Sequence, residues 1–173
     1  MIYNIALLPK NSSSEFIDLA LLFANHADYL LGNNCLPHLT VTMFLTADET
    51  LIDNLWLEAK SISNSLSISN IMLEFNKTNY KNENKYIWLE LLPKFDQRIL
   101  ELHFKLASLL QEYEISCLNA SLNDYHPHLT LARIEEKALV SKLKSLNVNI
   151  SDNFYMALGK SDTIGQFTNI IKF

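Results

Sequence analysis

The chain has 173 residues, of which 49% are apolar, and its formal net charge is −5. This size and apolar content predict one globular domain. The acidic balance excludes a uniformly basic groove for long nucleic acid, because such binding needs many Lys and Arg side chains against phosphates. A small phosphorylated ligand or the end of an RNA is compatible with this net charge.

The two cysteines, Cys35 and Cys117, lie far apart and outside any CxxC pattern. They favour reduced thiols over a disulfide framework or a thiolate metal site. The N-terminal residues lack the basic start and cleavage site of a secretory leader, and no segment approaches the ~20 apolar residues of a membrane span. We therefore expect a cytoplasmic, monomeric protein with no membrane segment.

The first half of the chain alternates strand-like and helical patterns. The predicted elements are a strand at 1–8, a helix that starts within 11–16 and fades near residue 29, a strand at 36–45, a helix with its apolar stripe at 52–62, and strands at 70–78 and 85–92 joined by a polar turn at 79–84. Thr46 and Glu49 have the spacing of a capping box for the second helix.

The second half repeats this order. Its predicted elements are a helix after Pro93, a short strand-like segment at 115–122, a strand at 126–134, a helix at 135–146, and strands at 152–160 and 166–173. The sequence therefore predicts a single domain, 1–173, built from two pseudo-symmetric halves of about 1–92 and 93–173. The strand-bearing parts of the two halves are expected to face each other.

The tetrapeptide Pro-His-Leu-Thr occurs twice, at 37–40 and 127–130, in a chain with only five histidines. A second copy arises by chance on the order of once in a thousand such chains, so chance alone is a poor but not negligible explanation. Both copies begin the strand that follows the first helix of their half. This shared position indicates that the repeat has a common role.

Each copy presents a His-x-Thr pattern on a strand, where side chains alternate between faces. The residues expected on the polar faces are His38, Thr40, Thr42, His128 and Thr130. The residues expected in the core are Leu39, Val41, Met43, Leu129 and Leu131. Each strand thus places an imidazole beside a hydroxyl on a face that apolar packing keeps rigid.

Two imidazoles on opposite sides of one ligand can perform acid–base chemistry. Histidine has an unperturbed pKa of ~6.5, so one ring can be neutral and the other charged at physiological pH. One ring takes a proton from an attacking hydroxyl or water, and the other gives a proton to a leaving oxygen. Threonine hydroxyls donate to non-bridging phosphate oxygens. The pattern therefore predicts phosphodiester transfer without a metal.

The tetrads HLTV from His38 and HLTL from His128, in duplicated half-domains, resemble those of the 2H phosphoesterase superfamily, also called the 2′-5′ RNA ligase or RNA 2′,3′-cyclic phosphodiesterase group. The resemblance covers nearly the whole chain. The opening MIYNIALLP is similar to the family's first strand, KYIWLELLP to its mid-chain strand, and HPHLTLAR to the second motif of the bacterial RNA cyclic phosphodiesterases.

This resemblance implies an α+β, bilobal, duplicated fold, with two small antiparallel sheets facing across a cleft and helices packed outside. It implies that His38 and His128 form the acid/base pair and that Thr40 and Thr130 bind the substrate phosphate. The implied substrate is a nucleotide or RNA terminus with a 2′,3′-cyclic phosphate or a 2′-5′ linkage. The implied activity is hydrolysis or reversible formation of such esters, and no cofactor or metal is expected.

Four further residues are candidates for the site. His126 shares a strand face with His128, and Tyr86 and Trp88 share a face on which a nucleotide base can stack. Arg133 matches the arginine of the bacterial second motif. Because it lies three residues past Thr130, it reaches the same face only if the strand ends or bulges there.

Two other functions are compatible with these residues. One is a non-catalytic module of the same fold that binds a nucleotide or an RNA end. The other is a zinc-dependent hydrolase with His38, His126 and His128 as ligands, although no carboxylate or cysteine is placed to complete the set. The residues leave open the exact substrate, hydrolysis versus ligation, and which histidine is the acid.

Overall fold

The structure is a computed structural model that describes residues 1–32, 34–119, 124–135 and 137–173. Its strands are β1 (Ile2–Pro9), β2 (Ala27–Leu30), β3 (Leu39–Leu45), β4 (Ile71–Glu83), β5 (Tyr86–Pro93), β6 (Leu129–Ile134), β7 (Ile150–Ser161) and β8 (Phe167–Lys172). Its helices are α1 (Ser13–Leu21), α2 (Leu51–Ser65), α3 (Gln97–Glu112) and α4 (Val140–Lys144), with 3₁₀ turns η1 (Ala24–His26) and η3 (Lys137–Leu139). The predicted α+β class is confirmed.

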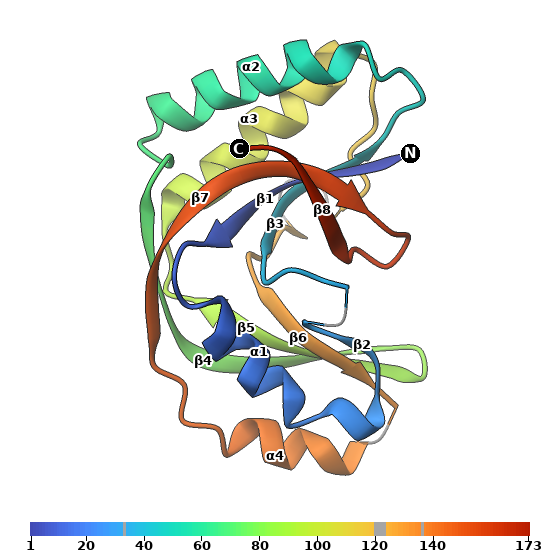
Figure 1. The fold of residues 1–173 in the computed structure, drawn as a ribbon, viewed down its shortest axis with the longest axis vertical. Coiled ribbons are helices and arrows are strands. Elements are labelled where there is room, and N and C mark those ends of the chain that lie inside the picture. The colour runs from blue at the N-terminus through green and yellow to red at the C-terminus, as the bar shows by residue number, and fades with distance from the viewer. Residues whose placement is uncertain (33, 120–123, 136) are drawn as a thin grey trace.

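Within the described residues, eight strands form one antiparallel sheet in the order β1-β3-β6-β5-β4-β7-β8, with β2 beside β6. An additional pairing of β1 with β7 closes the first six of these strands into a ring. The long strands β4 and β7 curve from the part of the ring below α2 and α3 to the part above α1 and α4 (Figure 1). The two sheets expected to face each other are these upper and lower parts of the ring.

Strands from both ends of the chain alternate in the ring. β1 pairs with β7 from Tyr3↔Lys160 to Pro9↔Phe154, and β5 pairs with β6. Each part of the ring therefore contains strands from before and after residue 92. The division into halves of about 1–92 and 93–173 stays a prediction about the sequence repeat, and the halves are not separate bodies in space.

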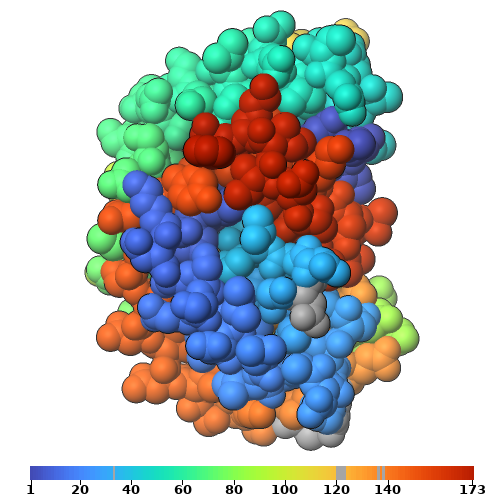
Figure 2. All heavy atoms as spheres, viewed as in Figure 1, coloured from blue at the N-terminus to red at the C-terminus, as the bar shows by residue number. Residues whose placement is uncertain are grey.

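The apolar core lies between the helices and the sheet. Below the ring, the Phe16 ring of α1 packs edge-on against Phe75 of β4 and Phe154 of β7, with ring centroids 5.3 and 6.2 Å apart. Above the ring, buried side chains of α2 and α3 such as Leu55 and Leu102 are fully enclosed. On the face seen in Figure 2, the C-terminal residues (red) lie between those of α2 (green to teal) and those around α1 (blue).

Several element boundaries differ from the sequence prediction. The first helix ends at Leu21, and Ala27–Leu30 form strand β2 against β6 instead, where Tyr29 is buried edge-on against the Trp88 ring. The capping box does not form: α2 begins at Leu51, and the Thr46 hydroxyl accepts a hydrogen bond from the amide of Asp48.

The polar segment predicted as a turn is largely strand. β4 continues to Glu83, which pairs with Tyr86, and the chain reverses at Asn84, whose φ is 56°. The cross-strand ladder explains this extension, since polar side chains are tolerated on an exposed hairpin.

Residues 115–119 of the expected 115–122 strand contain only the bridge Cys117↔Phe44, and 120–123 lie outside the described residues. In the described part of 135–146, the expected helix is present as η3 and α4. No helix in the described ranges combines the length and the apolar content needed to cross a bilayer.

The carboxylate of Asp152, near the start of β7, fixes the beginning of α1. It accepts hydrogen bonds from the backbone amides of Asn11 at 2.7 Å and Ser12 at 2.8 Å, and from the Ser12 hydroxyl at 2.9 Å. Burial raises the pKa of Asp152, but these hydrogen bonds outweigh that effect and lower the pKa to about 2. The charged form is therefore bound to the helix start in the folded state.

We expect Asp152→Asn to lower the free energy of unfolding by about 2 kcal/mol at pH 7. Because the folded-state pKa lies below that of the unfolded chain, this contribution is fully present above about pH 4 and is lost as the pH falls through about 2. Urea unfolding at several pH values measures it, and the exposed Asp18→Asn on the same helix serves as control. Equal stabilities of the variant and the wild type at pH 7 would contradict this role.

Candidate active site

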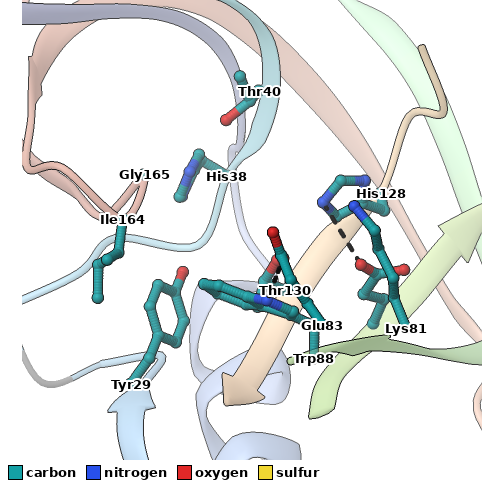
Figure 3. Close-up of a pocket in the computed structure, with 11 residues that line it drawn as sticks. Tyr29, His38, Thr40, Lys81, Glu83, Trp88, His128, Thr130, Ile164 and Gly165 are labelled. Carbon is teal, nitrogen blue, oxygen red and sulfur yellow. Dashed lines mark hydrogen bonds and ion pairs between the residues drawn. The ribbon is translucent and has the colours of Figure 1, made fainter. Parts of the chain in front are cut away.

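The two motif strands meet at a single antiparallel pair, Leu39↔Leu129, and each leucine directly follows its histidine. Both leucines are fully buried. Continued in both directions, this register places His38 opposite Thr130 and Thr40 opposite His128. These four side chains lie on the face opposite the leucines and line one pocket of about 190 Å³ (Figure 3). The structure therefore brings both His-x-Thr patterns to one pocket.

Strand β3 has a β-bulge directly after its motif. Ala6 of β1 pairs with Thr40 and Ile5 pairs with Thr42, which leaves Val41 as the extra residue. Strict alternation is broken at this point. The prediction that Thr42 shares the polar face is therefore wrong, since it is fully buried, and Met43, predicted in the core, is half-buried.

Strand β6 has a bulge at the matching position. Glu90 of β5 pairs with Thr130 and Leu89 pairs with Ala132, so Leu131 is the extra residue. Leu131 and Ala132 are both buried, and Arg133 returns to the face of Thr130. The bulge on which the position of Arg133 depends is therefore present.

Arg133 and Tyr86 do not line the pocket but support its wall. The Arg133 guanidinium forms an ion pair with Asp28 at 2.6 Å and lies 5.0 Å from the centre of the Trp88 ring and 4.2 Å from that of Tyr86. Trp88 does line the pocket, and its indole N–H donates a hydrogen bond of 2.9 Å to Glu83. Arg133 and Glu83 thus fix the orientation of the Trp88 ring.

His38 is oriented by its own backbone. Its Nδ1 lies 2.8 Å from the carbonyl oxygen of Leu36, and a carbonyl can only accept, so Nδ1 carries the hydrogen and Nε2 has the free lone pair. Burial is the main cause that lowers the pKa of His38 to about 4, with a smaller lowering effect of His128 and against raising effects of the Leu36 and Gly165 backbone. His38 is therefore neutral at pH 7.

His128 repeats this backbone contact in a different environment. Its Nδ1 lies 2.8 Å from the carbonyl oxygen of His126, again two residues earlier. Its side chain is 40% exposed, and Nε2 lies 3.7 Å from the carboxylate of the buried Glu90. The side chain of His126 is exposed and does not line the pocket, so His126 acts at this site through its backbone carbonyl.

The Thr40 hydroxyl is held as an acceptor. The side-chain amide of the fully buried Asn4 donates to its Oγ1 at 3.0 Å, and the Tyr125 hydroxyl donates to the Thr40 carbonyl at 2.8 Å. Because Oγ1 already accepts one hydrogen bond, its own hydrogen is left to donate elsewhere. An anionic oxygen in the pocket would be a suitable acceptor.

Several pocket residues were missed from the sequence. They are Tyr29, Glu83, Glu90, Ile164 and Gly165. The sequence does mark Glu90, because it is the only charged residue within 86–92 and lies two residues after Trp88, on the same strand face. Lys81 and Glu83 were assigned to a turn, and Ile164 and Gly165 come from the β7–β8 connection, for which the sequence gives no signal.

In the part of the chain that the structure describes, no group of three or more His, Cys, Asp or Glu side chains is arranged to hold a metal ion. The zinc ligand set of His38, His126 and His128 is not assembled, because the His126 side chain lies outside the pocket. The pocket presents instead two imidazoles, two threonine hydroxyls and the side chain of Lys81. This set can bind an anion and exchange protons with it.

No family model and no curated protein matches the sequence. Among solved structures, E. coli LigT in complex with 3′-AMP is similar, with a TM-score of 0.66 and 17% identity over 99% of this chain and 94% of that chain. A phosphoesterase has a TM-score of 0.62 and 18% identity over 99% and 95% of the two chains. The PDE domain of MHV ns2 has a TM-score of 0.55 and 17% identity over 99% and 98%.

These similarities extend over almost the full length of each chain, and they show that this protein has the same fold. The fold expected from the motif resemblance is therefore confirmed. LigT has also been crystallised with NADP⁺, phosphate and ATP.

The buried His38 should make stability depend on pH. Its folded-state pKa of about 4 lies below the unfolded value of ~6.5, so its stabilising contribution is complete above about pH 6.5 and is lost as the pH falls through about 4. We expect a total loss of about 3 kcal/mol over this range. Urea unfolding of the wild type and of His38→Gln measures it, and equal pH slopes in the two proteins would show that His38 is not held neutral.

Proposed function

We propose that the protein belongs to the 2H phosphoesterase superfamily and is a metal-independent phosphodiesterase. Its proposed substrates are nucleotides or RNA ends with a 2′,3′-cyclic phosphate or a 2′-5′ linkage. The observation that supports this most is the pocket in which His38 and His128 face one space, each with Nδ1 bound to a carbonyl, together with Thr40 and Thr130. The shared fold with LigT, crystallised with 3′-AMP and with phosphate, adds support.

The proposed reaction needs only these side chains. For a cyclic phosphate, one imidazole takes a proton from water as the water oxygen bonds to phosphorus, and the other gives a proton to the ribose oxygen as its bond to phosphorus breaks. Hydroxyl hydrogens of the two threonines donate to the non-bridging oxygens, where negative charge increases. With a ribose 5′-hydroxyl in place of water, the same ring opening forms a 2′-5′ linkage, as the bond from phosphorus to the 3′-oxygen breaks and that oxygen takes the proton.

The size and charge of the pocket favour a short substrate. The pocket has a volume of about 190 Å³, which is small for an RNA strand, and an acidic chain offers little general attraction for long RNA. Lys81 is placed to attract the anion, and the Trp88 ring at the pocket edge offers a surface for a base.

Removing either imidazole should abolish most of the activity. We expect His38→Ala and His128→Ala each to lower kcat/KM on nucleoside 2′,3′-cyclic phosphates by roughly 10²- to 10⁴-fold, because each residue supplies one proton transfer. Chromatography that separates 2′- from 3′-phosphate products gives both the rate and the bond that is cleaved. EDTA should leave the rate unchanged.

The matched control is His26→Ala, which removes an exposed histidine of η1 and should keep wild-type activity. Full activity in either motif variant would refute the two-histidine mechanism. Binding of cyclic and 2′-5′ substrates without any product from the wild type would instead identify a binding module.

A further inference from the structure

Glu90 is a buried carboxylate that the reaction described above does not use. It lies on β5, between β4 and β6, and its side chain is 7% exposed. One oxygen accepts a hydrogen bond of 2.9 Å from the side-chain amide of Asn79, its cross-strand partner on β4. The other oxygen lies 3.7 Å from Nε2 of His128. Buried carboxylates are costly unless they are paired with a cation, and His128 is the group placed to serve as that cation.

The distance of 3.7 Å is also informative. It is too long for a hydrogen bond but short enough for strong electrostatic attraction. Nε2 of His128 thus faces the Glu90 carboxylate without a hydrogen bond to it. Because Nδ1 is already bound to the His126 carbonyl, the Nε2 proton is the one that an oxygen in the pocket can receive.

The partner histidine has the opposite surroundings. Among the described residues, no carboxylate lies within ion-pair distance of His38, and its ring packs against Phe167 with centroids 5.5 Å apart. These surroundings disfavour the imidazolium, in keeping with the lowered pKa of His38. The two histidines make the same contact with the backbone, but within the described residues a carboxylate lies beside His128 and none lies beside His38.

We propose that Glu90, fixed by Asn79, is a positioning residue that keeps Nε2 of His128 protonated, which makes His128 the proton donor and His38 the proton acceptor. This assignment rests on the proposed function. In ring opening, His38 takes the proton of the attacking water, and His128 gives its proton to the departing ribose oxygen. Exchange with solvent then returns one proton to His128 and removes one from His38.

The other charged and titratable groups around the pair come from four segments. They are Lys81 and Glu83 on β4, Tyr29 on β2 and His38 before β3. Glu83 is engaged by the indole of Trp88 at 2.9 Å and is exposed, which makes it a suitable comparison. Glu90→Gln and Glu83→Gln each remove one carboxylate from the same pocket.

The test is the pH profile of kcat/KM on a nucleoside 2′,3′-cyclic phosphate. In Glu90→Gln we expect the alkaline limb, which reports the proton donor, to move to lower pH by about one unit while the acidic limb stays in place. Activity should therefore fall more at pH 8 than at pH 6. Glu83→Gln should leave both limbs in place, and Glu90→Asp should recover part of the shift.

A merely structural role for Glu90 would lower activity equally at all pH values, and that result would overturn the proposal. A second readout needs no substrate: NMR titration of the histidine ring signals, assigned with His38→Gln and His128→Gln. In Glu90→Gln the protonation midpoint of His128 should move to lower pH, and an unchanged midpoint would overturn the proposal even in an active enzyme. If the wild type turns over no substrate, the proposed function fails, and the NMR comparison still decides the pairing of Glu90 with His128.

Discussion

The antiparallel contact between Leu39 and Leu129 is the constraint on which the site depends. Among the residues that the structure describes, it is the only strand pair between β3 and β6, and it fixes the register in which each histidine faces the threonine of the other motif. Because both leucines are buried, the opposite faces of the two strands must point into the pocket. A slip of one residue would turn both imidazoles toward the core. Apolar packing at these two positions therefore determines the polar arrangement on the other side.

The pocket combines a repeated backbone with unequal surroundings. Each histidine is oriented by a carbonyl two residues earlier, and each motif strand bulges directly after its threonine. This repetition accounts for the symmetry of the arrangement. The differences come from single side chains outside the motifs, above all the buried Glu90 beside His128 and the apolar surroundings of His38. Two chemically identical groups are in this way placed in different electrostatic surroundings within one pocket.

Sequence reasoning found most strands and helices and the four motif residues that line the pocket, because period-two alternation and a repeated tetrapeptide are local signals. It failed where pairing with a distant strand decides the outcome. The bulge at Val41 buries Thr42, strand β2 forms because β6 offers an edge, and β4 extends because β5 continues to pair with it. Glu90 had a visible signal as a lone charge in an apolar strand, but its partner His128 lies on another strand. Neighbours of this kind are set by the fold and are absent from any local pattern.

The interleaving of early and late strands affects how the molecule is made. β1 pairs with β7, which places Tyr3 opposite Lys160. The lower part of the ring is complete only when β5 has paired with β6. Contacts this distant in sequence slow folding, because loop entropy is lost before any pairing compensates for it. During synthesis the first strand can pair with β3 early, but it leaves the ribosome long before β7 exists, and the edge that pairs with β7 is exposed to other chains in that interval. The ring closes only after β7 has emerged, so no partial chain that ends before β7 can form the closed sheet.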